Sequence, residues 1–442
     1  MRGGHKRAIN DLGTPLGGWP FGPLIRGLGG ALPWWAMTQL SDENLHWQAK
    51  AREVAEDVVR PLAAKYDVAQ EYPWEIKDAI AEAGLFGVWI PEAYGGSGKH
   101  EWNIRNLVAV VEQLSRACGG VGVLFAVNAL GSLPLIVGGT EEQKQHYLPQ
   151  VAAGEKLIAF CLSEKTAGSD AQALKTRAVE TGGGWRIHGE KKWMTNGGAA
   201  DLYTVFAVTD PEEKSAARIS AFIVEKDDPG FSIGKVEDKM GIRCTPVVET
   251  RFDGVEVDES RLLGGQTGKG FRHAMATLDM ARPGVAAQGM GLAQGALELA
   301  NRYTSQRNQF GQPVNRFQMV QQMLADMAMK TEAARQLIYA AAGAADSGNL
   351  AAVNQLAALA KCFATDVAME VTTDAVQLFG GYGFMKDYPI EKYMRDAKIT
   401  QIYEGTNQVQ RMVIARNLAK EAESLGFLDE VIPAEDQDVY EG

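Results

Sequence analysis

Leu157-Ile158-Ala159-Phe160-Cys161-Leu162-Ser163 is where the hydrophobic periodicity of this chain changes from helical to strand-like. Four more short segments of this kind follow, each bounded by turn residues: Trp185 to Lys191, Leu202 to Val208, Ile219 to Glu225 and Val247 to Phe252. They predict a small β domain between Lys156 and Val257. Apolar residues recur at helical spacing on both sides of it, so the sequence predicts the order α, β, α.

Helices are predicted before and after the β domain. Ser41 can cap a first helix that carries Asp42 and Glu43 in its first turn and continues through Val58. Two further helices and an intervening loop precede the strands: Glu101 to Ala117, Gly122 to Val137, and the loop Pro91 to Gly98. From Gly270 the pattern predicts a bundle of long helices: Val285 to Ser305, Phe317 to Ser347 and Leu350 to Phe379.

Composition excludes several classes of function. The 44 basic and 55 acidic residues give a net charge of −11, which opposes nonspecific binding to nucleic acid or to an anionic membrane. The four cysteines form no C-x-x-C pair and the six histidines have no metal-binding spacing, so neither a disulfide framework nor a metal site is predicted. We find no run of about 18 apolar residues that predicts a membrane span. No G-x-G-x-x-G follows a strand, so a Rossmann domain is not predicted either.

The two ends of the chain differ from the rest. Residues 1–37 are rich in Gly and Pro, with basic side chains and Asp11 as the only acid, and we expect a disordered extension. A translated upstream stretch with Met37 as the natural start is favoured over a transit peptide, because the extension lacks Ser. A cytoplasmic, bacterial location is expected in the first case and the mitochondrial matrix in the second. Residues 426–442 are expected to form a tail.

Glu404 is the strongest candidate for chemistry, in Ile402-Tyr403-Glu404-Gly405-Thr406-Asn407-Gln408. No Lys or Arg neighbours this carboxylate, and Gly405 lets a ligand approach the backbone closely. If desolvated, the group would have a raised pKa and suit general base catalysis near neutral pH. The alternative is an acid at the N-terminus of a helix from Thr406 to Leu418, stabilised by the helix dipole. This segment alone leaves both interpretations open.

Four other motifs occur in order along the chain. They are Ser163-Glu164-Lys165-Thr166-Ala167-Gly168-Ser169-Asp170, Trp193-Met194-Thr195-Asn196-Gly197-Gly198, Arg307-Asn308-Gln309-Phe310-Gly311 and Gln377-Leu378-Phe379-Gly380-Gly381-Tyr382-Gly383. With the Glu404 segment they resemble the acyl-CoA dehydrogenase family from about Leu40 to about Leu418, and most of all its short-chain, butyryl-CoA members. The resemblance implies an α+β fold with an N-terminal helical domain (38–155), a middle β-barrel-like domain (156–267) and a C-terminal four-helix bundle (268–425).

The resemblance also implies bound FAD between the β domain and the C-terminal helices. Thr195 would hydrogen-bond near the hydride-accepting nitrogen of the flavin, Trp193 would pack against the ring, and Ser163 would reach its pyrimidine edge. The other implied flavin contacts on this side are Phe160, Leu162, Ser169 and Met194. By its local sequence alone, Trp193 is expected to be an aromatic residue at a strand end in the core and not a cofactor contact.

A second set of FAD contacts is implied from a neighbouring subunit of a homotetramer. Arg307 is the phosphate partner in that set, and its other members are Gln309, Phe310, Gln318, Gln377, Leu378, Gly380, Gly381, Thr406 and Gln408. Read without the resemblance, Gly380 and Gly381 are simply a helix stop.

Substrate contacts are implied at Ser169, Asp279, Arg282, Tyr403 and Gly405. Alone, Asp279 and Arg282 are an ordinary i, i+3 helix ion pair. The chain departs from the family motif T-E-P-G-A-G-S-D, since Lys165 stands where Pro is usual, and we expect a looser loop there. A minority branch of the family carries its base at the position of Ala281, which cannot act as one.

The expected activity is oxidation of a short-chain acyl-CoA to the trans-2-enoyl-CoA, with Glu404 as the base, FAD as the hydride acceptor and an electron-transferring flavoprotein as the partner that reoxidises it. Branched and alicyclic acyl groups stay open. A peroxide-forming acyl-CoA oxidase and a non-catalytic CoA-binding or assembly protein are the alternatives.

Overall fold

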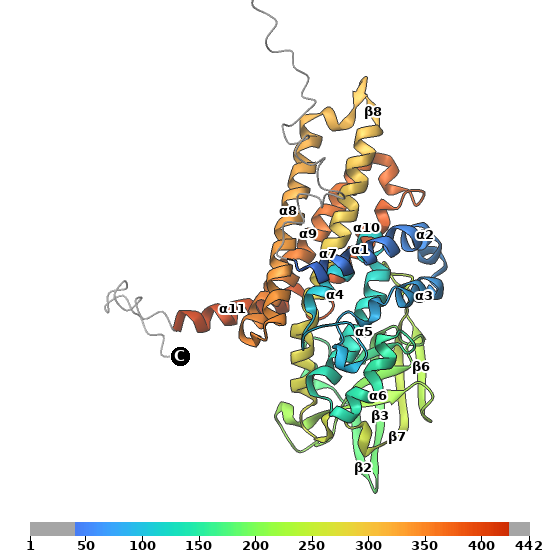
Figure 1. Ribbon diagram of the computed structural model, residues 1–442, viewed down its shortest axis with the longest axis vertical. Helices are drawn as coiled ribbons and strands as arrows, with labels where there is room; N and C mark the ends of the chain where they lie inside the picture. Colours follow the sequence, from blue (N-terminus) through green and yellow to red (C-terminus); the bar gives the residue numbers. More distant parts are fainter. Residues whose placement is uncertain (1–39, 424–442) are drawn as a thin grey trace, which may run out of the picture. The chain divides into compact units, whose positions relative to one another are not determined.

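The computed structural model of the protein describes residues 40–423, shown as a ribbon in Figure 1. The predicted extension at 1–37 and tail at 426–442 lie outside the described residues. Within 40–423 the chain forms helices, then strands, then helices, which confirms the predicted order. Short 3-10 turns connect these elements at Leu85–Gly87, Glu92–Tyr94, Ala171–Ala173, Ala216–Arg218, Glu259–Arg261, Leu263–Gly265, Val314–Arg316 and Gly380–Phe384.

The N-terminal part is helical. Its elements are α1 (Asp42–Val54), a π-helical turn η2 (Ala55–Val59), α2 (Arg60–Ala69), α3 (Trp74–Glu82), α4 (Ile104–Ala117), α5 (Gly119–Gly138) and α6 (Glu141–Ala152). As predicted, Ser41 caps α1, and its hydroxyl accepts from the Asn44 backbone N–H at 3.2 Å. Among the described helices, α5 is the one long and apolar enough to cross a membrane, so the expectation that no such run occurs was wrong. Most of α5 is buried inside the protein, as in a core helix.

The middle part is a seven-stranded sheet. Its strands are β1 (Ile158–Cys161), β2 (Arg177–Thr181), β3 (Gly184–Thr195), β4 (Leu202–Val208), β5 (Ile219–Glu225), β6 (Phe231–Val236) and β7 (Val247–Asp258). They lie in the order β1-β4-β2-β3-β7-β6, with β5 paired to β4. β4 and β5 match their predictions, whereas β3 and β7 are longer than predicted. β2 and β6 were missed; β6 is an edge strand with no buried residue, so it lacks the apolar alternation that predicts a strand.

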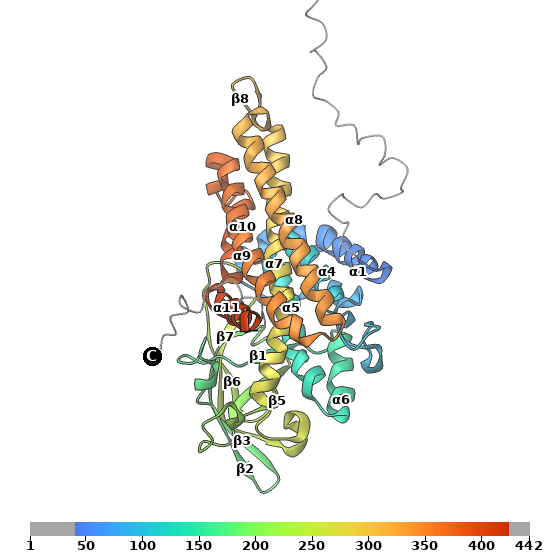
Figure 2. The same cartoon turned by 90° about the vertical axis from the view of Figure 1, so that its left-hand side faces the viewer.

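The C-terminal part is a helical bundle made of α7 (Gly270–Gln306), α8 (Gln318–Asp346), α9 (Leu350–Phe379), α10 (Ile390–Thr400) and α11 (Asn407–Glu423). A small hairpin of β8 (Asn308–Gln309) and β9 (Gln312–Pro313) joins α7 to α8. Figure 2 shows α7, α8 and α9 side by side. α9 matches its prediction, but α7 begins well before Val285 and continues through Pro283, which removes one backbone hydrogen bond without ending this buried helix.

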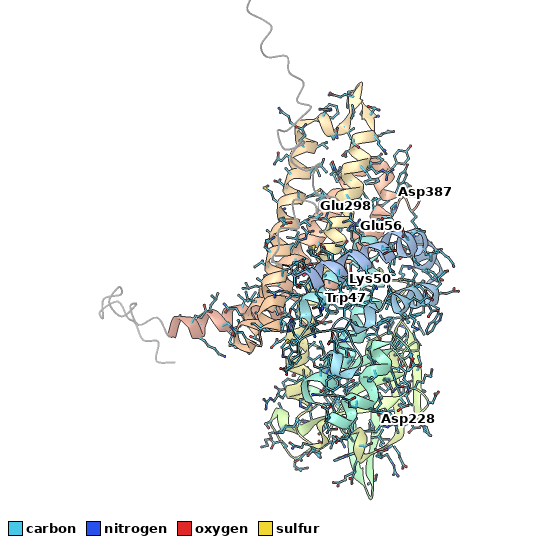
Figure 3. The ribbon with its side chains drawn as sticks, in the orientation of Figure 1. Trp47, Lys50, Glu56, Asp228, Glu298 and Asp387 are labelled. Carbon is cyan, nitrogen blue, oxygen red and sulfur yellow. The ribbon has the colours of Figure 1, made fainter. Side chains whose placement is uncertain are left out.

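Buried polar contacts join the three parts. Arg116 of α4 forms ion pairs with Glu56 of η2 and with Glu298 of α7, two acids labelled in Figure 3. At the start of α5, the backbone oxygen of Gly119 accepts from the side-chain amide of Gln288 on α7 at 2.8 Å. The next carbonyl, that of Gly120, accepts from the Thr245 hydroxyl of the β part at 2.7 Å. The N-terminal end of α5 is therefore a fixed contact point between the sheet and the bundle.

Candidate active site

Glu404 lies in a strained turn between α10 and α11. Its φ is 53° and that of Gly405 is 92°, so two successive residues adopt the left-handed conformation that a residue with a side chain rarely takes. Three side chains hold the carbonyl groups of this turn. Arg282 Nε donates to the Glu404 oxygen at 3.3 Å, Gln410 Nε2 donates to the Gly405 oxygen at 3.1 Å, and Lys361 Nζ donates to the same oxygen at 2.9 Å.

The Glu404 carboxyl group is the unsatisfied polar group of this turn. Its Oε2 is buried and has no hydrogen-bond partner within residues 40–423. Burial raises the pKa of Glu404 to about 7, although the positive charges of Arg282 and Lys361 oppose the increase. The Thr406 hydroxyl, and not the Glu404 carboxylate, accepts from the Val409 backbone N–H at the start of α11, at 3.2 Å. The Glu404 carboxylate therefore does not cap α11 through its side chain, and its unpartnered oxygen can accept a proton.

Arg282 and Asp279 form the ion pair that their spacing on α7 predicts, at 2.5 Å. Asn354 of α9 donates to both oxygens of Asp279, at 3.2 and 3.0 Å. Because Arg282 also contacts the Glu404 carbonyl, the structure brings three predicted substrate and base positions together. Ala281, on the same stretch of α7, is buried and supplies no acid.

Trp193 is exposed by an irregularity in the sheet. The register of β3 against β7 shifts between Lys191 and Met194, a bulge that turns Trp193 outward with φ of 64°. Its side chain is 50% exposed, whereas that of Met194 is 2% exposed. The core interpretation of Trp193 is therefore wrong, and Met194 takes the core position beside it.

The Ser163 segment lies directly beside this bulge. The Lys192 backbone N–H donates to the Ser163 carbonyl oxygen at 3.0 Å, which places Ser163 next to the residue that precedes Trp193. Thr195 follows at the end of β3 and pairs with Val247 of β7. Two motifs distant in sequence thus form one edge with a half-exposed indole ring and two partly buried hydroxyls, those of Ser163 and Thr195.

A buried ion pair holds this edge in place. Lys191 Nζ lies 2.8 Å from the Glu164 carboxylate and donates to the Leu162 carbonyl at 3.0 Å. Burial would raise the pKa of Glu164, but the Lys191 charge and the hydrogen bonds to the carboxylate lower it below its usual value. The Glu164 N–H also donates to the Ala167 oxygen at 3.0 Å, and the reverse bond measures 3.2 Å. The loop that Lys165 was expected to loosen is therefore closed without proline.

The remaining predicted contacts of this side lie close to these groups in sequence but differ in burial. Leu162 is buried, Phe160 of β1 is half-buried and Ser169 is exposed. Thr406 and Gln408 belong to the second predicted set but follow the Glu404 turn directly; Thr406 is half-buried and Gln408 is exposed. Tyr403 is half-buried and its hydroxyl donates to Gln288 Oε1. Gln288 also contacts Gly119, so Tyr403 is tied to the start of α5.

The rest of the second predicted set lies elsewhere, at the β8 end of α7 and α8. Figure 1 shows β8 at the end of these helices that points away from strands β2 and β3. Phe310 is 94% exposed there, and the Arg307 guanidinium lies 5.6 Å from the centre of the Tyr382 ring. α9 ends at Phe379, and Gly380 has φ of 59°, so the predicted helix stop is confirmed. The other members of the set at this end are Gln309, Gln318, Gln377, Leu378 and Gly381.

Comparisons with known proteins decide the family. Sequence models of the N-terminal, middle and C-terminal domains of acyl-CoA dehydrogenase match residues 41–155, 159–255 and 268–419. The chain belongs to the acyl-CoA dehydrogenase family. Its predicted fold class is thereby confirmed, with an N-terminal helical, a middle curled-sheet and a C-terminal helical domain. The protein is an FAD-dependent oxidoreductase of this family.

Individual relatives cover nearly the whole described chain. The probable acyl-CoA dehydrogenase fadE25 of Mycobacterium leprae is 47% identical over 388 residues, which are 88% of this chain and 98% of the relative. The butyryl-CoA dehydrogenase structure from Megasphaera elsdenii matches with a TM-score of 0.83 and 43% identity over 86% of this chain and 99% of that one. A solved chain from work on the electron transferring flavoprotein of Acidaminococcus fermentans matches with a TM-score of 0.82 and 47% identity, over 86% and 98% of the two chains.

The edge formed by Trp193, Ser163 and Thr195 has the groups that a bound flavin requires. A flat aromatic ring held outward by the β3 bulge offers a stacking face, and the Ser163 and Thr195 hydroxyls beside it can hydrogen-bond to ring heteroatoms. Arg307 lies next to β8, at the end of the bundle that points away from β2 and β3 (Figure 1).

Sequence reasoning missed three residues that hold the Glu404 turn: Lys361, Gln410 and Gln288. Lys361 offered a clue, because it is the sole basic residue of α9 and lies in register with the buried positions Ala357, Ala364 and Ala368. Gln410 and Gln288 are uncharged, and their contacts depend on tertiary structure that no local pattern predicts.

Proposed function

We propose that this acyl-CoA dehydrogenase oxidises a short, saturated acyl-CoA to the trans-2-enoyl-CoA, with Glu404 as the base that removes the α-proton. One observation carries the proposal: the buried Oε2 of Glu404 has no hydrogen-bond partner among residues 40–423, and burial raises the pKa of this carboxyl group to about 7. A carboxylate of that pKa is ionised in a large fraction of molecules at neutral pH and is still basic enough to take a proton.

The residues of the chain have distinct tasks in this proposal. Glu404 accepts the α-proton, and its backbone N–H is the proposed donor to the thioester oxygen, where negative charge develops. Arg282 and its partner Asp279 form the side of the proposed substrate site that α7 contributes. Arg282 also holds the Glu404 carbonyl in place. Trp193, Thr195 and Ser163 hold the flavin, with the contacts proposed above. When bound, FAD supplies the acceptor for the hydride from the β-carbon.

The position of the Arg307 set supports a homotetramer. Arg307, Phe310 and Gln377 are exposed. Figure 1 shows β8, which follows Arg307, at the end of the bundle that points away from β2 and β3. An exposed guanidinium over the Tyr382 ring suits the phosphates of a dinucleotide held mainly by a second copy. We propose that each copy completes the FAD site of a neighbour in this way.

Butyryl-CoA is the proposed test substrate, because a butyryl-CoA dehydrogenase is among the similar solved structures. Branched or alicyclic acyl groups differ from it by a few pocket contacts, each with a modest effect on specificity. The proposed electron acceptor is an electron-transferring flavoprotein. It is supported by the solved relative from work on such a flavoprotein.

The test is anaerobic mixing of the purified, FAD-loaded protein with a panel of acyl-CoAs while the flavin absorbance is followed. Butyryl-CoA is expected to bleach the flavin faster than long-chain acyl-CoAs do. Rapid bleaching by a branched or alicyclic acyl-CoA, with slow bleaching by butyryl-CoA, would replace the proposed substrate. If no acyl-CoA in the panel bleached the flavin, the proposed activity would be wrong.

A further inference from the structure

Lys361 is a buried cation beside the proposed base. It is the sole basic residue of α9, and its side chain is fully buried. Nζ donates to the Gly405 carbonyl at 2.9 Å and to Asn407 Oδ1 at 2.8 Å. Both acceptors belong to the segment that carries Glu404. The buried Lys361 ammonium therefore donates to the Gly405 backbone and to the Asn407 side chain, which follow the proposed base. A buried charge is costly unless it is paired or well hydrogen-bonded, and no carboxylate pairs with Lys361 in the described chain.

Asn407 extends this contact into a buried network. Its side-chain amide donates to the Thr365 hydroxyl at 2.8 Å and to Asp366 Oδ1 at 2.7 Å, both on α9. Asp366 also accepts from Gln401, which precedes the turn, at 2.6 Å. Through these bonds α9 holds the chain before and after Glu404, at Gln401 and Asn407. Lys361 is the α9 residue that binds the turn itself, at the Gly405 carbonyl.

The turn needs these contacts because its backbone conformation is strained. Glu404 and Gly405 both have positive φ, and a residue with a side chain keeps this conformation only where its surroundings impose it. The carbonyl that Lys361 binds belongs to the peptide between Gly405 and Thr406, one residue beyond Glu404. Rotation of that peptide would move the carboxylate, and small displacements of a catalytic group have large effects on rate.

The charge of Lys361 acts on the same carboxylate. The charged and titratable groups that act on Glu404 or Lys361 are Arg282 from α7, Cys362 and Asp366 from α9, and Tyr403 from the turn. Asp279 of α7 pairs with Arg282, and Arg411 of α11 pairs with Asp366. Among these, Arg282 and Lys361 are the cations that lower the pKa of Glu404 against the effect of burial. Burial in turn lowers the pKa of Lys361 to about 8, and the Glu404 charge opposes that decrease.

We propose that Lys361 is a positioning residue for Glu404, which clamps the Gly405 peptide and Asn407 so that the carboxylate points at the substrate, and whose charge keeps that carboxylate ionised. This inference rests on the proposed role of Glu404 as the base. It assigns to α9 a part in the chemistry that the family motifs do not include.

The test compares the FAD-loaded variants Lys361→Met and Asn407→Ala with the wild type by anaerobic stopped flow with butyryl-CoA. We expect Lys361→Met to lower the limiting rate of flavin reduction by roughly tenfold or more, with little change in the Kd for butyryl-CoA. The midpoint of the acidic limb of its pH profile should move upward, because a cation that favoured the Glu404 carboxylate is gone. Asn407→Ala should lower the rate and leave the midpoint in place.

Infrared difference spectra provide a readout that needs no turnover. The carboxylic acid band that disappears in Glu404→Gln reports protonation of Glu404, and it should titrate at higher pH in Lys361→Met than in the wild type. Lys330→Met is the matched control, since Lys330 forms an ion pair between α8 and α9 at 2.6 Å on the exterior. It should change neither the limiting rate nor the titration.

Two results would overturn the inference: wild-type limiting rates in both Lys361→Met and Asn407→Ala, or an unchanged Glu404 titration in Lys361→Met. If Lys361→Met does not fold, Lys361→Arg replaces it, because arginine keeps the charge but changes the hydrogen bonds to Gly405 and Asn407. The expected result is a slower limiting rate of flavin reduction with an unchanged midpoint of the pH profile. A wild-type rate would contradict the positioning role. Glu404→Gln distinguishes a failure of the proposed base from a failure of the role proposed for Lys361. Normal flavin reduction by Glu404→Gln would refute the base itself, whereas an inactive Glu404→Gln beside a normal Lys361→Met refutes the role of Lys361 alone.

Discussion

Arg282 Nε lies 3.3 Å from the carbonyl oxygen of Glu404, while the same guanidinium forms an ion pair with Asp279 at 2.5 Å. One arginine therefore binds the backbone of the proposed base and a carboxylate on its own helix. Because Arg282 is 7% exposed and its partners are fixed, it restrains the carbonyl of Glu404 without neutralising the Glu404 carboxylate by a direct bond. The base is held by its backbone and left free at its side chain.

Glu404→Gln should keep the fold and bound FAD but reduce the flavin with butyryl-CoA about 10²–10⁴-fold more slowly, which is the usual size of a general base contribution. The amide fills the same volume and cannot accept the proton. Anaerobic stopped flow measures the rate, and the FAD spectrum checks cofactor content. Glu259→Gln, at an exposed acid after β7, is the control and should react like the wild type. Near-normal reduction by Glu404→Gln would remove Glu404 from the mechanism.

The pH dependence of activity and of stability should have opposite signs at Glu404. In the substrate-free enzyme, kcat/KM should rise with pH through an apparent pKa near 7, because the ionised carboxylate is the base. Since the folded-state pKa of about 7 lies above the usual 4.5, the contribution of this group to stability is complete below pH 4.5 and is lost as the pH rises to about 7.

Glu404→Gln should therefore be more stable than the wild type above pH 7, by about 1–3 kcal/mol in the free energy of unfolding, and this advantage should disappear near pH 4.5. Denaturant unfolding at several pH values measures the difference. An advantage that did not change with pH would show that the Glu404 pKa is not raised.

Arg307→Ala should weaken FAD retention and lower the melting temperature together, because bound cofactor stabilises the folded state by mass action. Arg302→Ala is the control, an exposed arginine on α7 in the turn before Arg307. Sedimentation of both variants and the wild type tests the tetramer directly. A wild-type protein that is fully active as a monomer would contradict the shared FAD site.

Lys191→Met should destabilise the protein by about 3–5 kcal/mol, because it leaves the buried Glu164 carboxylate without its cation. FAD retention should fall as well, since Lys191 also binds the Leu162 carbonyl beside Ser163. In the exposed pair of Arg186 and Glu256, Arg186→Met should cost less than about 1 kcal/mol. Equal costs for the two variants, measured by denaturant unfolding, would show that the buried pair has no special role.

The order of the domains could be predicted because strong periodicity survives in β4, β5, α8 and α9, where burial is one-sided or complete. β2 and β6 could not be predicted, since most of their residues are exposed and carry no alternation. The start of α7 was missed where a buried helix continues through Pro283. The boundaries predicted for the three domains stay predictions.

The identity of the candidate site residues could be proposed from the sequence, but the contacts and backbone conformations that hold them could not. The family resemblance implied Glu404, Thr195 and Arg282 as site residues, yet it could not show that Glu404 has positive φ or that a bulge turns Trp193 outward. Both conformations depend on contacts from distant parts of the chain. The lysine of α9 that binds the Gly405 carbonyl was missed for the same reason, because its partners lie on other elements.

The last prediction concerns the electron acceptor. An oxidase must admit oxygen to the reduced flavin, whereas a dehydrogenase that keeps its enoyl product against the ring excludes oxygen and passes electrons through a protein contact. We expect the product-bound, reduced enzyme to reoxidise slowly in air and rapidly with an electron-transferring flavoprotein.

Stopped flow after reduction with butyryl-CoA compares the two rates, and a peroxide assay counts the electrons that reach oxygen. Removal of the enoyl product by gel filtration is the control, because the free reduced enzyme should react with oxygen faster than the product complex does. If oxygen reoxidised the product complex as quickly as the flavoprotein did, with one peroxide per flavin, the enzyme would be an oxidase. The half-exposed Trp193 would then border an oxygen path and not a surface closed by product.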